Sequence, residues 1–471
     1  MIFLYQLCYQ SGDKTFCGDC MPFYWDGKFW IFHQRDNRNP VPLDGEPLCW
    51  SLASTTDFIH YEDLGPALLC GADDEQDQFI YAGSVMEKDG LFHAFYTGYN
   101  RDYIGTGKPS QVLMHAVSRD LKKWDKIPED RIYPPSQGYE PDDWRDPYVL
   151  YDEENQRYVM ILAARKRKGP KVRRGCTVYL TSKDLKTWEF QGDFWDPELF
   201  YTHEMPDLFQ MGDYWYFLYS EYSDKHITRY RRSKSMYGPW EALEDDAFDG
   251  RAYYAARTAT DGDKRYLFGW IPTRANNFDK NTWQWGGALF VQEVYQREDG
   301  TLGVRCPETI EKAFCGEKPC QAALPLTLGG PDRREETVLF SNTGSFFRLD
   351  LTLELRENVR AVGIKLFEDL ENDIGYEYTL LPGRNRVQFD RTPNLPWYQC
   401  LNTGLERPVE LAPGKEYRVT IIADGDVCVF YLNGTALSSR MYHKTGENIL
   451  LYSSGGPVAI KEAKLFQSLE A

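Results

Sequence analysis

The sequence of 471 residues has no long hydrophobic run and a deficit of basic charge. No stretch approaches the ~18 uninterrupted apolar residues that a membrane-spanning helix requires. Its 54 Lys and Arg residues are outnumbered by 71 Asp and Glu residues, which gives a net charge of −17. Such an excess of negative charge repels phosphate backbones and anionic lipids. We therefore predict a soluble protein with neither a nucleic-acid partner nor a membrane partner.

Paired cysteine motifs are also scarce. Eleven cysteines, an odd number, are spread over a chain that is long enough to bury a hydrophobic core without the help of disulfide bonds. Cys17 and Cys20 form the one close pair, and a zinc site would need two more ligands at similar spacing, which the sequence does not offer. Residues 1–8 are apolar but lack the basic flank and cleavage site of a secretory signal. These features predict reduced thiols, no metal and a cytoplasmic location.

Aromatic residues are plentiful, at 15% of the chain, and 38 Gly and 26 Pro residues punctuate it. This mixture is typical of many short strands and turns. A pattern of Ser, an acidic or polar residue, an apolar residue and an aromatic residue recurs, each copy after an alternating segment and before a turn. The copies are 54–61, 118–124, 182–188 and 233–240, and their first serines are 64, 64 and 51 residues apart. A repeat of this kind fixes the architecture.

Segments between the copies are rich in aromatic and β-branched residues, as at 90–97, 157–164 and 214–220. A unit of ~40–50 residues or more that holds about four strands is typical of a β-propeller blade. Residues 1–310 have room for five units, of which the weaker fifth runs through 265–270 and 287–291. We predict an all-β chain that begins with a five-bladed β-propeller over residues 1–310.

The composition changes after Pro307. Residues 311–336 carry Pro, Gly and charge without periodicity, and we predict a linker there. Beyond it, segments 346–355, 417–422 and 427–432 alternate at period two and are joined by hairpin turns. Repeated hairpins without helical stretches predict a C-terminal β-sandwich domain over residues 337–471.

Three acidic residues stand out, one in each of three predicted blades: Asp19, Asp146 and Glu204. When several carboxyl groups converge on the central funnel of a propeller, ionising all of them is unfavourable because their negative charges repel. The pKa of one carboxyl group should therefore rise, while hydrogen bonds keep the other carboxyl groups charged. Acetal cleavage needs this division between a nucleophile, a proton donor and a charge that steadies an oxocarbenium ion. Each residue taken alone also fits a structural role, since Asp before Pro is a common turn residue.

The motifs around these acids resemble a known family. Gly-Asp-x-x-Pro at 18–22, Arg-Asp-Pro at 145–147 and Glu-x-Pro-Asp-Leu at 204–208, set among the repeats and followed by a sandwich, are similar to glycoside hydrolase family 32. Its members include invertases, inulinases and levanases, five-bladed propellers that cleave β-fructofuranosides with retention. The resemblance implies Asp19 as nucleophile, Asp146 as transition-state stabiliser and Glu204 as general acid and then base. It implies no metal and no cofactor.

The same resemblance implies five substrate-binding residues. Arg145 is expected to hold the geometry of Glu204 or Asp146 through paired hydrogen bonds. Gln34 matches a sugar-contacting glutamine, and Tyr81 stands where the family usually has Phe. Phe16 and Trp144 are expected to form walls of the sugar pocket.

Three positions depart from the family pattern. Gly18 replaces the Asn of the usual Asn-Asp-Pro-Asn-Gly motif, Met205 replaces a Cys after the acid, and Ala82 replaces a Ser. Each lost hydrogen bond is worth about 0.5–1.5 kcal/mol, enough to redirect substrate preference without removing the catalytic acids. We therefore expect a retaining, exo-acting hydrolase that releases terminal fructosyl units from sucrose or short fructo-oligosaccharides.

Two other functions stay open. One is an inverting arabinofuranosidase or xylofuranosidase of a related five-bladed family, which the C-terminal sandwich and the Gln34 motif disfavour. The other is a sugar-binding propeller without activity, suggested by the altered loop around Asp19 and disfavoured by the presence of all three acids.

Several further features have two interpretations. The basic run 165–174 fits either recognition of a phosphorylated sugar or a solvated hairpin tip. The second domain fits either structural support for the propeller or a contact in a homo-oligomer. Some His and Trp side chains could face the sugar or could simply pack in the blades: His33, His203, Trp25, Trp283 and Trp285.

Overall fold

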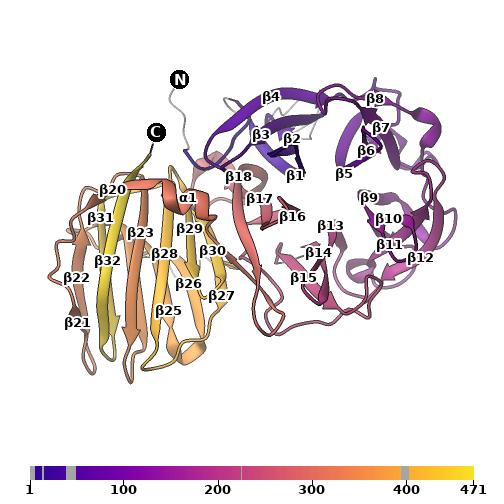
Figure 1. Ribbon diagram of the computed structural model, residues 1–471. Helices are drawn as coiled ribbons and strands as arrows, with labels where there is room; N and C mark the ends of the chain where they lie inside the picture. The colour runs from indigo at the N-terminus through magenta and orange to yellow at the C-terminus, as the bar shows by residue number, and fades with distance from the viewer. Residues whose placement is uncertain (1–5, 13–14, 39–48, 224, 394–402, 471) are drawn as a thin grey trace.

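The computed structural model of the protein describes residues 6–12, 15–38, 49–223, 225–393 and 403–470. Regular structure in these residues is almost entirely β strand, and the α-helix found there is the short α1 (Glu308–Ala313). No helix in these ranges combines the length and the apolar character needed to cross a membrane. The strands form a ring of sheets and, beside it, a sandwich of two sheets (Figure 1).

The ring consists of groups of antiparallel strands that are consecutive in the sequence. The first group holds β1 (Phe16–Trp25), β2 (Lys28–Asp36), β3 (Trp50–Thr55) and β4 (Tyr61–Leu68). The second holds β5 (Phe79–Lys88), β6 (Leu91–Tyr99), β7 (Gln111–Ser118) and β8 (Asp125–Lys126). The third holds β9 (Tyr139–Asp152), β10 (Arg157–Lys166), β11 (Gly175–Ser182) and β12 (Glu189–Trp195). Then follow β13 (Thr202–Met211), β14 (Tyr214–Tyr222) and β15 (Thr228–Ser233), and finally β16 (Tyr254–Thr260), β17 (Arg265–Arg274), β18 (Trp283–Gln296) and β19 (Leu302–Arg305).

The first strand of every group lies nearest the centre of the ring: Figure 1 shows β1, β5, β9, β13 and β16 around one open axis. The two ends of the ring adjoin, because β1 pairs with β18 through Cys17 and Gly287. This arrangement confirms the prediction of an all-β chain with a propeller at its N-terminal side.

The sequence repeat marks the turn after the third strand of a group. At the end of β11, the Ser182 hydroxyl accepts a hydrogen bond from the Leu185 amide, and Asp184 accepts two more from backbone amides. In the first group the equivalent residue is Thr55, whose hydroxyl accepts from the Phe58 amide at 2.9 Å. Phe58 and Leu185 also share a positive φ, 64° and 65°. In the first copy of the repeat, the residue equivalent to Ser182 is therefore Thr55 and not Ser54. The prediction placed this copy one residue too early, because a Ser or a Thr hydroxyl can cap this turn.

The sandwich consists of two antiparallel sheets. One has the order β20 (Phe314–Lys318), β32 (Val458–Leu469), β23 (Phe346–Leu355), β28 (Glu416–Asp424), β29 (Val427–Leu432) and β30 (Thr435–Arg440), with β21 (Leu326–Leu328) also paired to β32. The other has the order β22 (Arg334–Phe340), β31 (Asn448–Ser454), β24 (Ala361–Asp369), β25 (Ile374–Leu381), β26 (Arg386–Thr392) and β27 (Glu406–Pro408). Alternating burial along β23 places every second side chain in the core between the sheets.

The range 311–336 contains sheet strands. β20 and β21 lie in it, and both pair with β32. Residues that the sequence marks as a linker are therefore partly built into the sandwich. Strands of five and three residues are too short for their alternation to be visible in the sequence.

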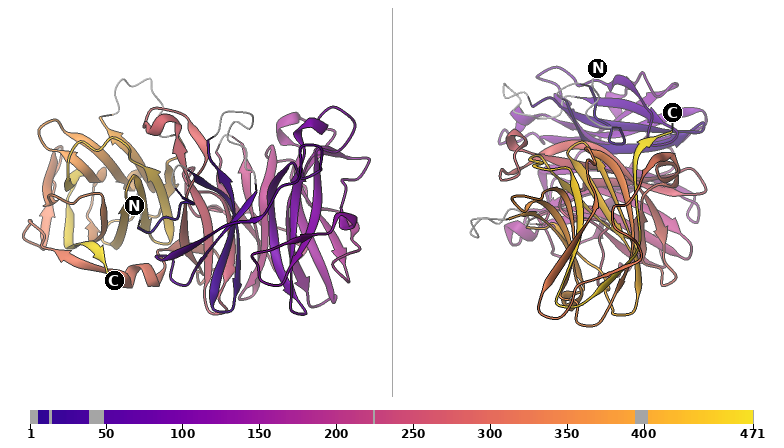
Figure 2. Two further views of the ribbon diagram at one scale, coloured as in Figure 1. Left: turned by 90° about the horizontal axis from the view of Figure 1, so that it is seen from above. Right: turned by 90° about the vertical axis from the view of Figure 1, so that its left-hand side faces the viewer.

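The sandwich packs against the outside of the ring and does not cover its axis (Figures 1 and 2). Ile422, Val429 and Tyr431 of the sandwich belong to the same buried cluster as Phe290 and Val291 of β18. Polar contacts reinforce the junction, because buried Arg440 donates hydrogen bonds to the carbonyls of Ile271 and Pro272 in β17. Strand β17 is thus supported directly by the second part of the molecule.

Candidate active site

Each of the five innermost strands carries an irregularity near the same end. Pairing shifts register between Cys17 and Cys20 in β1, between Tyr81 and Gly83 in β5, opposite Ile161 and Ala163 in β9, between Glu204 and Asp207 in β13, and between Tyr254 and Arg257 in β16. Such bulges re-aim side chains and are common beside active sites. Here they direct Asp19, Tyr81, Asp146, Glu204 and Tyr254 into one cavity.

Asp19 lies on the bulge of β1 and reaches the cavity from a partly buried position. The indole Nε1 of Trp270 donates a hydrogen bond to its Oδ1 at 3.0 Å. Burial, followed by the negative charges of Asp146 and Glu204, raises the pKa of Asp19 well above its ordinary value. The Trp270 hydrogen bond opposes this shift by favouring the carboxylate.

Asp146 is buried at the bulge of β9 and has a φ of 60°. Its amide donates to the Thr97 hydroxyl at 2.9 Å, and its Oδ2 accepts from the Met205 amide at 3.1 Å. Burial raises the pKa of Asp146, while the nearby Arg145 guanidinium lowers it. The hydrogen bond from Met205 ties this carboxylate to strand β13, which carries Glu204.

Glu204 is held by two donors. The Arg145 guanidinium donates to Oε1 at 2.8 Å, and the Tyr254 hydroxyl donates to Oε2 at 2.7 Å. Burial and then the charge of Glu204 raise the pKa of Tyr254 well above its ordinary value, so the phenol keeps its proton. Arg145 also lies 3.9 Å from Asp146, so one guanidinium contacts two of the three carboxyl groups.

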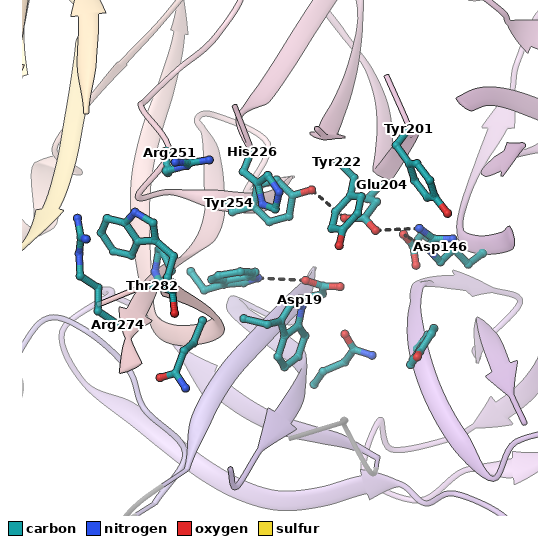
Figure 3. Close-up of a pocket in the computed structure, with 18 of the residues that line it drawn as sticks. Asp19, Asp146, Tyr201, Glu204, Tyr222, His226, Arg251, Tyr254, Arg274 and Thr282 are labelled. Carbon is teal, nitrogen blue, oxygen red and sulfur yellow. Dashed lines mark hydrogen bonds and ion pairs between the residues drawn. The ribbon is translucent and has the colours of Figure 1, made fainter. Parts of the chain in front are cut away.

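The three carboxyl groups face a single open cavity of about 1010 Å³. Figure 3 shows Asp19, Asp146 and Glu204 directed toward the same hollow, with Tyr201, Tyr222 and Tyr254 beside them. Trp283 and Trp285 also line the cavity. A hollow of this size with aromatic walls and a few convergent polar groups is suited to a small ligand such as a sugar.

A family model described as "Glycosyl hydrolases family 32 N-terminal domain" matches residues 19–300, more than half of the chain. The chain belongs to glycosyl hydrolase family 32.

Curated relatives extend the similarity beyond that domain. Sucrose-6-phosphate hydrolase of Escherichia coli is 24% identical over 476 residues, covering 94% of this chain and 91% of that protein. Levanbiose-producing levanase of Bacillus subtilis is 24% identical over 496 residues, covering 95% and 88%.

Solved structures share the fold over nearly the whole chain. Sucrose-6-phosphate hydrolase from Lactobacillus gasseri superimposes with a TM-score of 0.75 at 20% identity, covering 96% of this chain and 90% of that one. Fructan 1-exohydrolase IIa from Cichorium intybus gives a TM-score of 0.75 at 16% identity, covering 98% and 97%. The family 32 chain is thus a glycoside hydrolase with the propeller-plus-sandwich fold.

Six of the residues predicted from the sequence line the cavity of this family 32 enzyme: Asp19, Gln34, Tyr81, Arg145, Asp146 and Glu204. Two do not. Trp144 is fully buried in the core that β9, β10 and β11 share with β6 and β7, and Phe16 packs under the Arg38 guanidinium outside the cavity lining. The prediction of Trp144 as a wall failed because its neighbour Arg145 takes the inward position, and adjacent strand residues face opposite sides.

The His and Trp side chains with two interpretations also divide into those that line the cavity and those that do not. Trp283 and Trp285 line the cavity, whereas Trp25 is exposed elsewhere. His33 and His203 are fully buried outside the lining, and burial lowers the pKa of His203 to about 3. Neither histidine contributes a cation to the cavity.

The contacts that sequence reasoning missed include those of Tyr254 and Trp270 described above, and that of Arg257, whose guanidinium donates to the Asp146 carbonyl at 2.8 Å. Tyr254 and Arg257 both lie in β16, the innermost strand of the last group. The signal available in the sequence is the position of this segment at the start of a fifth unit, equivalent to the positions of the acids in their own units.

The basic run 165–174 contributes a buried charge to the site. Arg165 is inaccessible to solvent and pairs with Glu140 at 3.1 Å and with Asp143 at 3.2 Å. Asp143 in turn pairs with Arg145 at 2.6 Å, and Arg145 contacts Glu204. An ion-pair chain therefore links the start of the run to one carboxyl group of the cavity.

The rest of the run lies on the surface. Lys168 and Arg173 are exposed, and Lys166 pairs with Asp193 at 2.5 Å. The hairpin-tip interpretation therefore describes the middle of the run, and neither interpretation anticipated Arg165.

Among the described residues, no cluster of three or more His, Cys, Asp or Glu side chains has the geometry to hold a metal ion.

Proposed function

We propose that this family 32 chain is a retaining, exo-acting β-fructofuranosidase that releases terminal fructosyl units from sucrose or short fructo-oligosaccharides. The observation that carries the proposal is the convergence of Asp19, Asp146 and Glu204, from three separate strands, on one cavity with different partners for each. Relatives named for hydrolysis of sucrose 6-phosphate and levan support a fructoside substrate.

The proposed reaction has two displacement steps. In the first, the Asp19 carboxylate attacks the anomeric carbon of the fructosyl unit, the bond to the leaving oxygen breaks, and Glu204 gives that oxygen its proton. In the second, Glu204 takes a proton from water, the water oxygen attacks the anomeric carbon, and the bond to Asp19 breaks. Two inversions at one carbon give net retention.

Neighbouring groups suit these roles. The Trp270 hydrogen bond favours the charged Asp19 that the first step requires. Arg145 and Tyr254 fix both oxygens of Glu204, so its carboxyl group stays oriented while it gains and loses a proton. Asp146, anchored by the Met205 amide, would hold the fructosyl hydroxyls and offset the positive charge of the oxocarbenium-like transition state.

We also infer the finer architecture. The strand groups β1–β4, β5–β8, β9–β12, β13–β15 and β16–β19 are interpreted as five blades of a catalytic domain over residues 1–310. The sandwich domain is interpreted as beginning at β20, since this strand pairs with β32. A cytoplasmic location is supported by ten cysteines in the described residues that form no disulfide.

The test is the anomer released first. The protein is incubated with sucrose, inulobiose, levanbiose and an aryl arabinofuranoside, and NMR follows the earliest product. β-Fructofuranose as the first product is the expected result. Arabinose release or initial inversion would instead support the related inverting furanosidases, and no turnover of any sugar would support a binding protein. Asp19→Asn should abolish turnover.

A phosphorylated disaccharide is a second candidate substrate, favoured by the cationic side chains at one end of the cavity. Figure 3 shows Arg251 and Arg274 across Asp19 from Asp146, and Lys280 also lines the cavity. A phosphate on the leaving sugar could contact these groups. If it does, Lys280→Ala should raise KM for sucrose 6-phosphate but not for sucrose, while Lys168→Ala, on the exposed part of the basic run, should change neither.

A further inference from the structure

Gly18, the residue before Asp19, has an unusual neighbour. A Cβ atom at this position would lie 1.8 Å from Cη2 and 2.3 Å from Cζ2 of Trp285. The φ of Gly18 is not in the left-handed region, so glycine is required here by space and not by backbone conformation. The Trp285 ring occupies the volume that any side chain at position 18 would enter.

Trp285 is held in this place from several sides. Its ring lies 5.8 Å from that of Trp270, the donor to Asp19, at an angle of 57°. Behind it, the Arg38 guanidinium donates to the carbonyls of Trp285 and Gly286 and to the Thr273 hydroxyl. The ring is partly exposed and faces the cavity. The indole is therefore a fixed part of the wall next to Asp19.

We propose that Trp285 is a specificity-determining residue of the fructosyl site, and that Gly18 is present because it admits this ring. The proposal rests on the fructosidase function above. Where family 32 usually has an asparagine at position 18, this chain presents an indole face to the sugar ring. An aromatic face binds the apolar C–H side of a sugar through contact area, whereas an amide would bind hydroxyl groups.

The packing part of the proposal predicts a coupled pair. Gly18→Asn, which introduces the usual family residue, should collide with Trp285 and lower kcat/KM by about 100-fold or more, because Asp19 is the next residue. Adding Trp285→Ala should restore at least about 10-fold of that loss, since contacting residues give non-additive effects. Trp283→Ala is the matched control: Trp283 lines the same cavity from the same strand but is not among the atoms nearest Gly18, so it should restore nothing.

The binding part predicts a split between kinetic constants. Trp285→Ala alone should raise KM for sucrose about 10-fold and lower kcat less, because the ring contacts the sugar and not the reacting atoms. Trp285→Phe should recover most of the affinity. Additive losses in Gly18→Asn/Trp285→Ala, or an unchanged KM in Trp285→Ala, would overturn the proposal.

One readout does not depend on fructoside turnover. The smaller Gly18→Ala variant should lower the thermal unfolding midpoint, and Trp285→Ala should restore part of the loss; an unshifted midpoint in Gly18→Ala contradicts the packing claim. A wild-type protein that cleaves no fructoside would contradict the proposed function, yet this stability comparison would still decide whether the ring and a side chain at position 18 compete for one space.

Discussion

Asp19 shares its cavity with two other carboxyl groups, and this crowding sets its chemistry. Burial and the charges of Asp146 and Glu204 raise its pKa, while the Trp270 hydrogen bond lowers it. A nucleophilic Asp19 must be ionised, so activity is expected to fall as the pH drops through this raised pKa. The acid limb of the pH profile therefore reports on the neighbours of Asp19.

Two substitutions should move that limb in opposite directions. Asp146→Asn removes a negative charge, so the pKa of Asp19 should fall and the acid limb should shift to lower pH in the residual activity. Trp270→Phe removes a hydrogen bond to the carboxylate, so the acid limb should shift to higher pH. Profiles of kcat/KM against pH measure both shifts, and movement in the same direction would refute the assignment of Asp19 as the titrating nucleophile.

Tyr254 is expected to matter less than Glu204 itself. Tyr254→Phe removes one hydrogen bond to a charged group, worth about 1.5–3 kcal/mol, or about 10- to 100-fold in kcat. Glu204→Gln removes the proton donor and should cost at least about 1,000-fold with sucrose. A fructoside whose leaving group needs no proton should be cleaved by Glu204→Gln with a much smaller loss in the first step. Equal losses with both leaving groups would contradict the role of Glu204 as acid.

Residue-level prediction worked where local motif and strand position agreed. Asp19, Asp146 and Glu204 lie in short motifs that contain a Pro, and all three line the cavity. The prediction for Trp144 was wrong, because strand alternation turns its side chain to the opposite face from that of Arg145. The positive φ of Asp146 then breaks the alternation, so that Arg145 and Asp146 both face inward. Such a backbone irregularity has no signature in one sequence.

At the scale of elements, the chain of ion pairs joins β10, β9 and β13. Arg165→Met should leave Asp143 without its buried partner and let Arg145 and Glu204 shift. We expect a stability loss of about 3–5 kcal/mol together with a change in the pH profile of kcat. Denaturant unfolding and the pH profile measure the two effects. Arg173→Ala, on the exposed part of the same run, should change neither, and a stability loss without any change in the pH profile would limit Arg165 to a structural role.

The strands and turns of the propeller could be predicted because the first three copies of the repeat are closed by the same local hydrogen bonds. Asp120 and Asp184 accept amide hydrogen bonds two and three residues ahead, as the pattern requires. The bulges in the innermost strands could not be predicted, since they depend on which strand lies alongside. The short strands β20 and β21 escaped notice for the same reason: pairing with β32, and not their own sequence, makes them strands.

On the scale of the whole molecule, the two parts share buried contacts. Asp249, between β15 and β16, accepts hydrogen bonds from the Ser438 amide and hydroxyl, both at 2.7 Å, and from Gln292 at 3.0 Å. The apolar cluster also continues from β18 into β29. We therefore expect the propeller and the sandwich to unfold together.

Asp249→Ala tests this coupling. It would leave buried donors of both parts unpaired, at a cost of about 2–4 kcal/mol, while kcat/KM well below the unfolding temperature should be nearly unchanged. Calorimetry should show one transition in the wild type and one, at lower temperature, in the variant. Two transitions, of which only one moves, would show that the parts are independent.

The central claim is that Asp19 forms a covalent bond to the fructosyl unit. The most direct measurement uses Glu204→Gln with β-fructofuranosyl fluoride: the Asp19 carboxylate can displace fluoride without an acid, but water then lacks its base, so the intermediate accumulates. Mass spectrometry after rapid quenching should show the protein heavier by one fructosyl residue, located on the peptide with Asp19 and absent from Asp19→Asn/Glu204→Gln. An adduct on another residue, or fluoride release with no adduct at any time, would contradict the account.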